Sequence, residues 1–245
     1  TLPDAYLPLA RRLLQQTEPT LRVSAATREA LLAGSSIERH PAGKTLSRRA
    51  DPVHELLLVL DGNLEVSMQG SDGRRSICWY LAPGQWMGLI PVIDGRGAIH
   101  DLRSHTESVL LHIPRATFSQ ALQADHCLAL ACLNLLCERS RSLYANMAAE
   151  SLLPLRARVA RLLLMLVDQH GRDCQSGIEI ALKLSQDEFA DMLGVTRQSL
   201  NRELKALEKH GVISIAYSRI TRCDLPGLQR AAETASSKPP RGNCD

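Results

Sequence analysis

The stretch of residues 184–211, LSQDEFADMLGVTRQSLNRELKALEKHG, limits the possible folds of this chain more than any other part of it. Ser185 is followed three residues later by Glu188, the spacing of a capping box, which predicts that a helix begins here. Ala190 is small, as a residue must be where a second helix approaches closely. Gly194 is expected to end the first helix in a tight turn with a positive φ. The pattern predicts two helices joined by a sharp turn, the helix-turn-helix arrangement.

The second helix of this pair is predicted to begin at Thr196, a capping residue, and to bury a stripe of three leucines, Leu200, Leu204 and Leu207. The opposite face is rich in side chains that donate hydrogen bonds to base edges and phosphates. We therefore predict that this motif binds double-stranded DNA. The predicted DNA-binding residues are Ser185, Thr196, Arg197, Gln198, Ser199, Asn201, Arg202, Lys205 and Arg219.

Positive charge is concentrated in and after this second helix. Residues 196–222 contain six basic and two acidic residues, a net charge of +4, whereas the whole chain of 245 residues carries only +3. Such a local excess suits a polyanionic partner. The sequence VISIAYSRITRCDL that follows predicts two short strands joined by a turn, like the wing of a winged helix. The alternative is a small helical domain with a solvated basic face.

Residues 37–113 have a different sequence pattern, in which turn residues separate short apolar runs about every ten residues. This spacing predicts a small antiparallel β-barrel or jelly roll. The sequence ELLLVLDGNLEVSM is expected to form a strand, a hairpin turn at Asp61-Gly62 and a second strand. Residues 1–36 show helical spacing in pieces. With the helices predicted elsewhere, the fold class is α+β.

A long helix is predicted over residues 116–149, which contain no glycine or proline. Apolar and small residues recur along it at alternating steps of four and three, the spacing of a coiled coil. We predict that this seam forms a homodimer; the alternative is that it packs on the β-domain of its own chain. The predicted interface is Ala129, Leu133, Leu136, Ser140, Leu143 and Met147.

The cysteines and the apolar runs indicate the cellular compartment of the protein. An odd number of cysteines, seven, is not the pattern of a secreted disulfide framework. The N-terminal segment lacks the apolar core of a signal peptide, and the run LLLMLV is too short to cross a bilayer. We therefore expect a cytoplasmic protein without a membrane partner. Cys127, Cys132 and Cys137 follow steps of five, which spread around a helix, so no metal site or cofactor is predicted from them.

The segments SQDEFADMLGVTRQSLNRELKALEKHGVI and SRITRCDLPGL resemble the winged-helix domain of the Crp/Fnr family of bacterial transcription regulators. LLLVLDGNLEVS and LAPGQWMGLIPVIDG resemble the family's cyclic-nucleotide-binding-type barrel. The resemblance covers roughly residues 25–228. It implies a homodimer joined through the long helix, with two recognition helices in successive major grooves of a pseudo-palindromic operator. It also allows RNA polymerase as a partner.

Pro154 in the run SLLP interrupts the helical pattern and predicts a hinge between two domains. Residues 1–122 are expected to form the effector-type β-domain, and residues 123–150 the dimerisation helix and hinge. Residues 151–228 are expected to form the winged-helix domain. Residues 229–245 are expected to be a disordered tail.

The segment PGQWMGLIPVIDGRGAIHD, residues 83–101, is the loop that holds cyclic nucleotide in some members of this family. Those members have a glutamate just after a glycine and an arginine further on. Here Gly88 stands at the glycine, Leu89 at the glutamate and Ala98 at the arginine. A phosphate without a cationic partner is costly in a partly apolar pocket, and Arg96 and Arg103 are out of register. We therefore expect no control by cyclic nucleotide.

Other effectors remain open at this point. The first cysteine is Cys78, so the N-terminal cysteine cluster of an Fnr-type iron–sulfur centre is missing. Haem would need an axial ligand, for which Cys78, His100, His105 and His112 are candidates. Aromatic residues beside the loop predict an apolar pocket for a neutral effector, or else a core without a ligand. The predicted pocket residues are Trp79, Trp86, Met87, Gly88, Leu89, Ile90, Arg96 and Ala98, with Tyr80 beside them.

An enzyme of the cupin type is the alternative from another functional class, because cupins share the barrel architecture. Such enzymes usually bind a metal through a His-x-His pair, and none of the eight histidines forms one. No Gly-x-Ser-x-Gly motif or phosphate-cradling loop is present either. No catalytic residue is therefore predicted.

Overall fold

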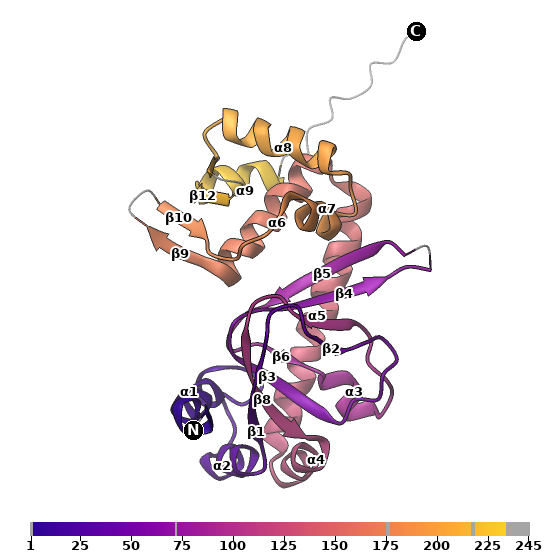
Figure 1. Cartoon of the computed structure of the whole chain (residues 1–245), viewed down its shortest axis with the longest axis vertical. Helices are drawn as coiled ribbons and strands as arrows, with labels where there is room; N and C mark the ends of the chain where they lie inside the picture. The colour runs from indigo at the N-terminus through magenta and orange to yellow at the C-terminus, as the bar shows by residue number, and fades with distance from the viewer. Residues whose placement is uncertain (1, 72, 175–176, 217–218, 234–245) are drawn as a thin grey trace. The chain divides into compact units, whose positions relative to one another are not determined.

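Two compact units, residues 1–141 and 142–245, make up the chain in the computed structural model (Figure 1). The structure describes residues 2–71, 73–174, 177–216 and 219–233. Each unit is built around its own sheet or sheets.

The N-terminal unit contains two four-stranded antiparallel sheets. One has the strand order β1-β8-β3-β6 and the other the order β2-β7-β4-β5. Their inner faces pack together through buried residues such as Val59 and Leu110 from the first sheet and Val66 and Leu102 from the second. The strands are β1 (Ser36–His40), β2 (Thr45–Ser47), β3 (Glu55–Asp61), β4 (Leu64–Gln69), β5 (Arg75–Leu81), β6 (Trp86–Met87), β7 (Asp101–Ser104) and β8 (Ser108–Pro114).

The predicted antiparallel jelly roll is confirmed, but within the described strands the two sheets do not close into a barrel. The predicted hairpin at Asp61-Gly62 is wrong, because β3 pairs with β8 and β6 whereas β4 pairs with β5 and β7. The chain passes from one sheet to the other at this turn. Gly62 is required there: its φ is +78°, and a Cβ would lie 2.2 Å from the backbone oxygen of Glu107.

Helices cover the outer face of the β1-β8-β3-β6 sheet (Figure 1). They are α1 (Leu2–Gln16), α2 (Ala25–Ala33), α4 (Arg115–Ala124) and α5 (His126–Leu152), and the short α3 (Leu89–Asp94) follows β6. Their core includes Leu14, Leu31, Phe118 and Leu128, each no more than 1% exposed. This second core holds the helices on the sheet.

The single long helix predicted over residues 116–149 is two helices, α4 and α5, separated by Asp125. Asp125 is extended, with φ −135° and ψ 99°. Its carboxylate accepts hydrogen bonds from the backbone N–H of Ser24 and of Cys127 and from the Thr27 hydroxyl, at 2.9–3.0 Å. An acceptor that caps α5 and binds the start of α2 favours the break over a continuous helix.

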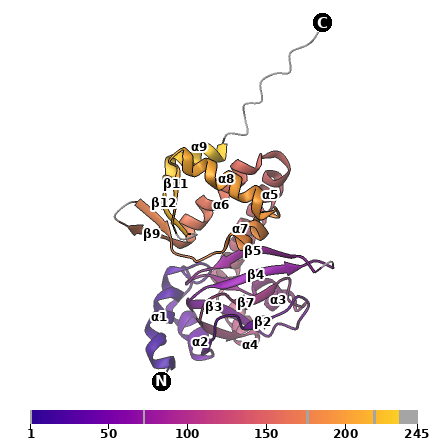
Figure 2. The ribbon, with the colours of Figure 1, turned by 45° about the horizontal axis from the view of Figure 1, so that its top comes forward.

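The C-terminal unit is a winged helix-turn-helix. Its elements are α6 (Leu155–His170), β9 (Gly171–Cys174), β10 (Gly177–Ile180), α7 (Gln186–Leu193), α8 (Arg197–Lys209), β11 (Ile213–Ala216), β12 (Arg219–Cys223) and α9 (Leu225–Glu233). Helix α6 packs against α8 and α9 (Figure 2). The sheet has the order β11-β12-β10-β9, so the predicted wing strands β11 and β12 gain a second hairpin that the sequence did not indicate.

Two further observations complete the fold. Helix α9 extends to Glu233, so residues 229–233 of the expected tail are helical; Leu228, 0% exposed, anchors α9. Residues 234–245 of that tail lie outside the described residues. Within the described part of the chain, no helix combines the length and apolarity needed to cross a membrane.

Candidate nucleic-acid interface

The turn between α7 and α8 is fixed by local hydrogen bonds. The Ser185 hydroxyl accepts from the backbone N–H of Glu188 at 3.2 Å, and the Glu188 carboxylate accepts from the backbone N–H of Ser185 at 2.7 Å. The predicted capping box is thus present. Gly194 follows α7 with φ +64° and ψ +34°. No atom lies within 4 Å of a Cβ built at Gly194, so the positive φ rather than space accounts for the glycine.

Helix α8 is held by one face, as predicted. The Thr196 hydroxyl accepts from the backbone N–H of Ser199 at 3.2 Å and caps the helix. The leucine stripe, Leu200, Leu204 and Leu207, is at most 3% exposed. The opposite face is exposed at Arg197, Gln198, Arg202 and Lys205. The helix therefore presents a fixed row of hydrogen-bond donors to solvent.

Two of the predicted DNA-binding residues are oriented by a residue that the sequence analysis missed. Gln186, the first residue of α7, accepts with its side-chain oxygen from Arg197 Nε at 3.1 Å and from Asn201 Nδ2 at 2.9 Å. Arg197 Nη1 also lies 3.5 Å from the Asp187 carboxylate. Because these contacts join two helices, spacing within one helix gave no sign of them.

A buried carboxylate connects α8 to α6. Glu203 is only 8% exposed and accepts from Arg156 Nε at 3.0 Å and from Arg202 Nε at 3.3 Å. A buried charge needs such partners, and removing one of them is costly. Arg202 remains 75% exposed, so its guanidinium reaches solvent while its Nε is fixed.

The wing follows α8 as expected. Strands β11 and β12 pair antiparallel, and Ile213, Ile220 and Cys223 point into the core. Arg219 begins β12, but its side chain lies outside the described residues. The hydroxyl of Ser185, also predicted to bind DNA, serves the capping box.

Comparisons with known proteins agree with this geometry. Residues 157–231 match the profile of the Crp-like helix-turn-helix domain, and residues 37–125 match that of the cyclic nucleotide-binding domain. The transcriptional regulator LdrP of Thermus thermophilus is 30% identical over 202 residues, which are 81% of this chain and 98% of LdrP. The chain belongs to the Crp/Fnr family of transcriptional regulators. The predicted family and the predicted function as a DNA-binding transcription regulator are thereby confirmed.

Other relatives of this Crp/Fnr regulator are more distant. The cAMP-activated global transcriptional regulator Vfr of Pseudomonas aeruginosa is 25% identical over 190 residues, which cover 76% of this chain and 88% of Vfr. The solved structure of FixK2 from Bradyrhizobium japonicum matches with a TM-score of 0.73 at 19% identity, over 82% of this chain and 99% of FixK2. The second comparison shows the shared fold alone.

The effector-type loop of this regulator contains the short helix α3. Gly88, with φ +96°, precedes it, and Gly95, with φ +75°, follows it. Leu89, which stands at the family's glutamate position, is 1% exposed and packs into the core beneath the helices. A residue buried in this way contributes to packing.

The arginine position of this loop holds no charge, and the nearby arginines have other partners. Ala98 is 9% exposed, and its backbone N–H and C=O are both used in 2.8 Å hydrogen bonds to the segment Ala50-Asp51. Arg96 is 86% exposed and lies 3.5 Å from Asp94 of its own loop. Arg103 donates to Glu65, a carboxylate only 1% exposed, at 2.8 Å.

The aromatic residues predicted to line one apolar pocket are divided between two cores. Trp86 packs with Leu89 beneath the helices, whereas Trp79 and Met87 pack between the sheets. Ile90 is 39% exposed. The structure therefore does not bring these residues together around one cavity.

The residues considered as haem ligands have other neighbours. The ring of His100 lies 5.0 Å from that of Trp79, and the ring of His105 lies 4.8 Å from that of Tyr80. Burial raises the pKa of the Cys78 thiol to about 11, so it is protonated at neutral pH and unsuited to binding iron as a thiolate. His112 contacts another histidine, His40.

The predicted seam on α5 is partly exposed. Leu133, Leu143 and Met147 are 56–59% exposed, a high value for large apolar side chains. Leu136 is half-buried and packs against the core beneath the helices, and Ala129 is half-buried too. Leu130 and Tyr144, which the seam did not include, are 56% and 69% exposed.

Proposed function

We propose that this Crp/Fnr regulator binds a pseudo-palindromic DNA site as a homodimer, through one copy of α8 in each of two successive major grooves. The observation that carries the proposal is the exposed face of α8. Arg197 and Asn201 on it are held in place by Gln186, and Arg202 by Glu203. Donors held in this way suit base edges and phosphates.

The exposed residues of α5 support the dimer. Leu133, Leu143 and Met147 recur at the spacing of a coiled-coil seam, and each leaves more than half of its side chain uncovered. A symmetric partner helix would bury these side chains against their own copies. The half-buried Leu136 contributes to the fold of the chain as well as to the proposed seam.

We propose further that cyclic nucleotide does not control this protein, although relatives such as Vfr are named as cAMP-activated. Leu89 and Ala98 are buried at the two positions where charge and hydrogen bonding would be needed. An apolar effector is not proposed, because the aromatic residues lie in two separate cores.

No catalytic activity is proposed, since the family consists of transcriptional regulators. As a regulator of transcription, the protein is assigned to the compartment that holds the DNA, the cytoplasm.

The test is selection of bound duplex fragments from a random pool by the full chain, followed by sedimentation of the complex. The expected result is a dyad-symmetric motif whose half-sites lie about 10 bp apart, with two chains bound per duplex. Arg202→Ala is expected to weaken binding to that motif by about 1–3 kcal/mol. A single half-site bound by one chain would contradict the dimer, and sequence-independent binding would contradict base reading.

A further inference from the structure

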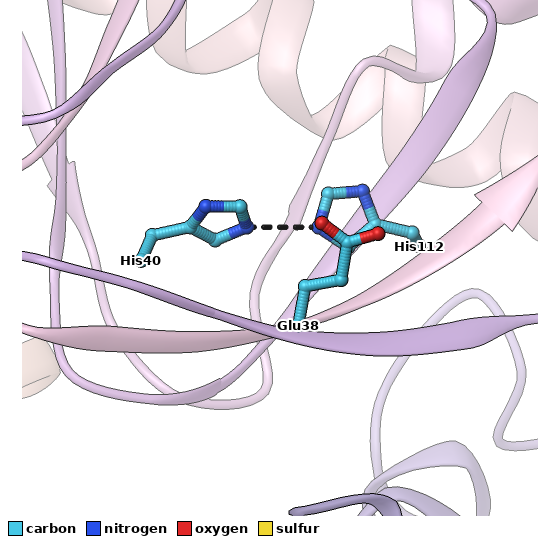
Figure 3. A group of neighbouring side chains, drawn as sticks. All are labelled: Glu38, His40 and His112. Carbon is cyan, nitrogen blue, oxygen red and sulfur yellow. Dashed lines mark hydrogen bonds between the residues drawn. The ribbon is translucent and has the colours of Figure 1, made fainter.

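Two buried histidines face each other in the N-terminal unit. His40 is the last residue of β1 and His112 lies in β8; they are 4% and 8% exposed. Their Nε2 atoms are 3.0 Å apart (Figure 3). The carboxylate of Glu38 lies beside the His112 ring, and one ligand atom from each of the three residues lies within 4.8 Å of the others.

The partners of the two Nδ1 atoms, which point away from the contact between the rings, define the tautomer of each histidine. His112 Nδ1 lies 2.7 Å from the Glu55 carboxylate, which only accepts, so Nδ1 carries the proton and Nε2 has a free lone pair. His40 Nδ1 lies 3.2 Å from Lys44 Nζ, which only donates, so the His40 proton is on Nε2. Lys44, His40, His112 and Glu55 thus form one chain of hydrogen bonds that runs in a single direction.

We propose that Glu38, His40 and His112 form a binding site for a divalent transition metal ion of the Zn²⁺ type. Two imidazole nitrogens and one carboxylate oxygen are the donor set that such ions prefer, with a fourth position left for water. Zinc–nitrogen bonds of about 2.0–2.1 Å at a tetrahedral angle require about 3.3 Å between the two nitrogens. The two nitrogens need to separate by only a few tenths of an ångström, and the two rings need to turn so that both lone pairs point at the ion instead of along the line between the nitrogens.

The surroundings of His112 are those of a metal ligand. A metal-bound histidine almost always donates its other ring N–H to a carboxylate or carbonyl, which fixes the ring and its tautomer. Glu55 does this for His112. The proposed carboxylate ligand, Glu38, also has a supporting contact: the Ser36 hydroxyl donates to it, with 3.4 Å between Oγ and Oε1. Glu38 is exposed, so the ion has a path of entry from solvent.

Lys44 acts against metal binding. The ion takes the lone pair of His40 Nε2, so the single proton of this neutral ring must move, through solvent, from Nε2 to Nδ1. The new Nδ1–H then faces the Lys44 ammonium, and two donors oppose each other. Lys44 must turn away, which its flexible stem permits at a cost in affinity. Glutamine at this position accepts a hydrogen bond from Nδ1–H, so Lys44→Gln is expected to bind metal more tightly than the wild type.

The experiment is a calorimetric titration of the full chain with Zn²⁺ alone, in a Cys127→Ser/Cys137→Ser background that removes two exposed thiols. We expect one Zn²⁺ per chain. Glu38→Gln, an exposed change of the same shape, should weaken binding at least tenfold, and Glu55→Ala, which removes the acceptor of His112 Nδ1–H, by about 10–100-fold. His54→Gln removes an exposed histidine outside the site and should leave the affinity unchanged. Lys44→Gln should tighten binding.

A second readout separates loss of binding from loss of folding. Co²⁺ bound by two histidines and a carboxylate gives visible absorption without thiolate charge-transfer bands, and circular dichroism reports whether each variant is folded. Binding that persists unchanged in folded Glu38→Gln and Glu55→Ala, or that shows thiolate bands, would overturn the site. So would the absence of Zn²⁺ binding at about millimolar concentration, where binding is worth about −4.1 kcal/mol.

Discussion

The Arg197 guanidinium donates across the helix-turn-helix to the side-chain oxygen of Gln186, with 3.1 Å between Nε and Oε1. The same oxygen accepts from Asn201 at 2.9 Å. One residue of α7 therefore sets the direction of two donors on α8. This arrangement reduces the side-chain freedom that both donors would otherwise lose on binding DNA.

Gln186→Ala is expected to weaken specific DNA binding by about 1 kcal/mol, the usual net value of a neutral hydrogen bond. The measurement is a gel shift on the selected operator, with Gln229→Ala, an exposed glutamine of α9, as control. In an Arg197→Ala background the same change should have a smaller effect, because one of its two partners is gone. Equal effects in both backgrounds would show that Gln186 does not act through Arg197.

The proposed dimer seam can be broken at residues that the fold does not need. Leu143→Glu with Met147→Glu would place carboxylates opposite their own copies in the paired helices. Both residues are more than half exposed, so folding of the chain should be retained. Sedimentation should show a monomer, whereas Arg141→Glu, on the other side of α5, should remain a dimer. A double variant that stays dimeric would place the interface elsewhere.

The effector-type loop leads to a prediction about cyclic nucleotides. Leu89 and Ala98 provide no partner for a ribose hydroxyl or a phosphate, and both are buried. Calorimetry with cyclic AMP or cyclic GMP should show no binding tighter than about 1 mM, equivalent to about −4.1 kcal/mol. Micromolar binding by the wild-type chain would refute this interpretation of the loop.

Features set by neighbours in the sequence were predictable from the sequence. The Ser185–Glu188 capping box, the Gly194 turn and the leucine stripe of α8 depend on residues within one or two helical turns. The hairpin at Asp61-Gly62 was predicted wrongly, because whether two strands share a sheet is decided by distant partners such as β8. An apolar run shows that a strand is buried, but not which sheet contains it.

The candidate metal site shows the same limit more clearly. His40 and His112 are 72 residues apart in the chain, and no spacing pattern connects them. The pairing of β1 with β8 brings their strands together. The prediction of an aromatic pocket was wrong for the opposite reason, since it joined residues that are close in sequence but separate in the fold. Trp79 and Trp86 pack in different cores, because Trp86 lies on the outer, helix-covered face of its sheet, whereas its neighbour Met87 and Trp79 face the space between the sheets.

Asp125 leads to a prediction about pH. Hydrogen bonds from the Ser24 backbone, the Thr27 hydroxyl and the Cys127 backbone lower the pKa of Asp125 to about 2. Unfolded aspartate has a pKa of about 3.9, so its stabilisation is complete above that pH and is lost as the pH falls towards 2. Asp125→Asn should lower the melting temperature at pH 6, and the gap between variant and wild type should narrow between pH 4 and 2. A gap that is constant with pH would mean that the charge is unimportant.

The last prediction concerns Gln198, an exposed residue in the first turn of α8. In well-known members of the Crp/Fnr family, the residue after the first arginine of the recognition helix is a glutamate, which accepts from a cytosine amino group. A glutamine amide both donates and accepts, and it pairs with adenine N6 and N7. The wild-type protein should therefore prefer a base other than cytosine at one position of each half-site, with adenine favoured.

Gln198→Glu tests this directly, because the two side chains have nearly the same shape. The variant should regain preference for C·G at that one base pair, by about 1–3 kcal/mol, and leave the other positions unchanged. The measurement is selection of bound fragments by both proteins at the same salt concentration, since phosphate contacts make affinity depend on salt. Lys205→Gln is the matched control: it removes a charge from the same face of α8 and should weaken binding to all sequences alike. Identical half-sites for wild type and Gln198→Glu would leave base reading to Arg197, Asn201 and Arg202.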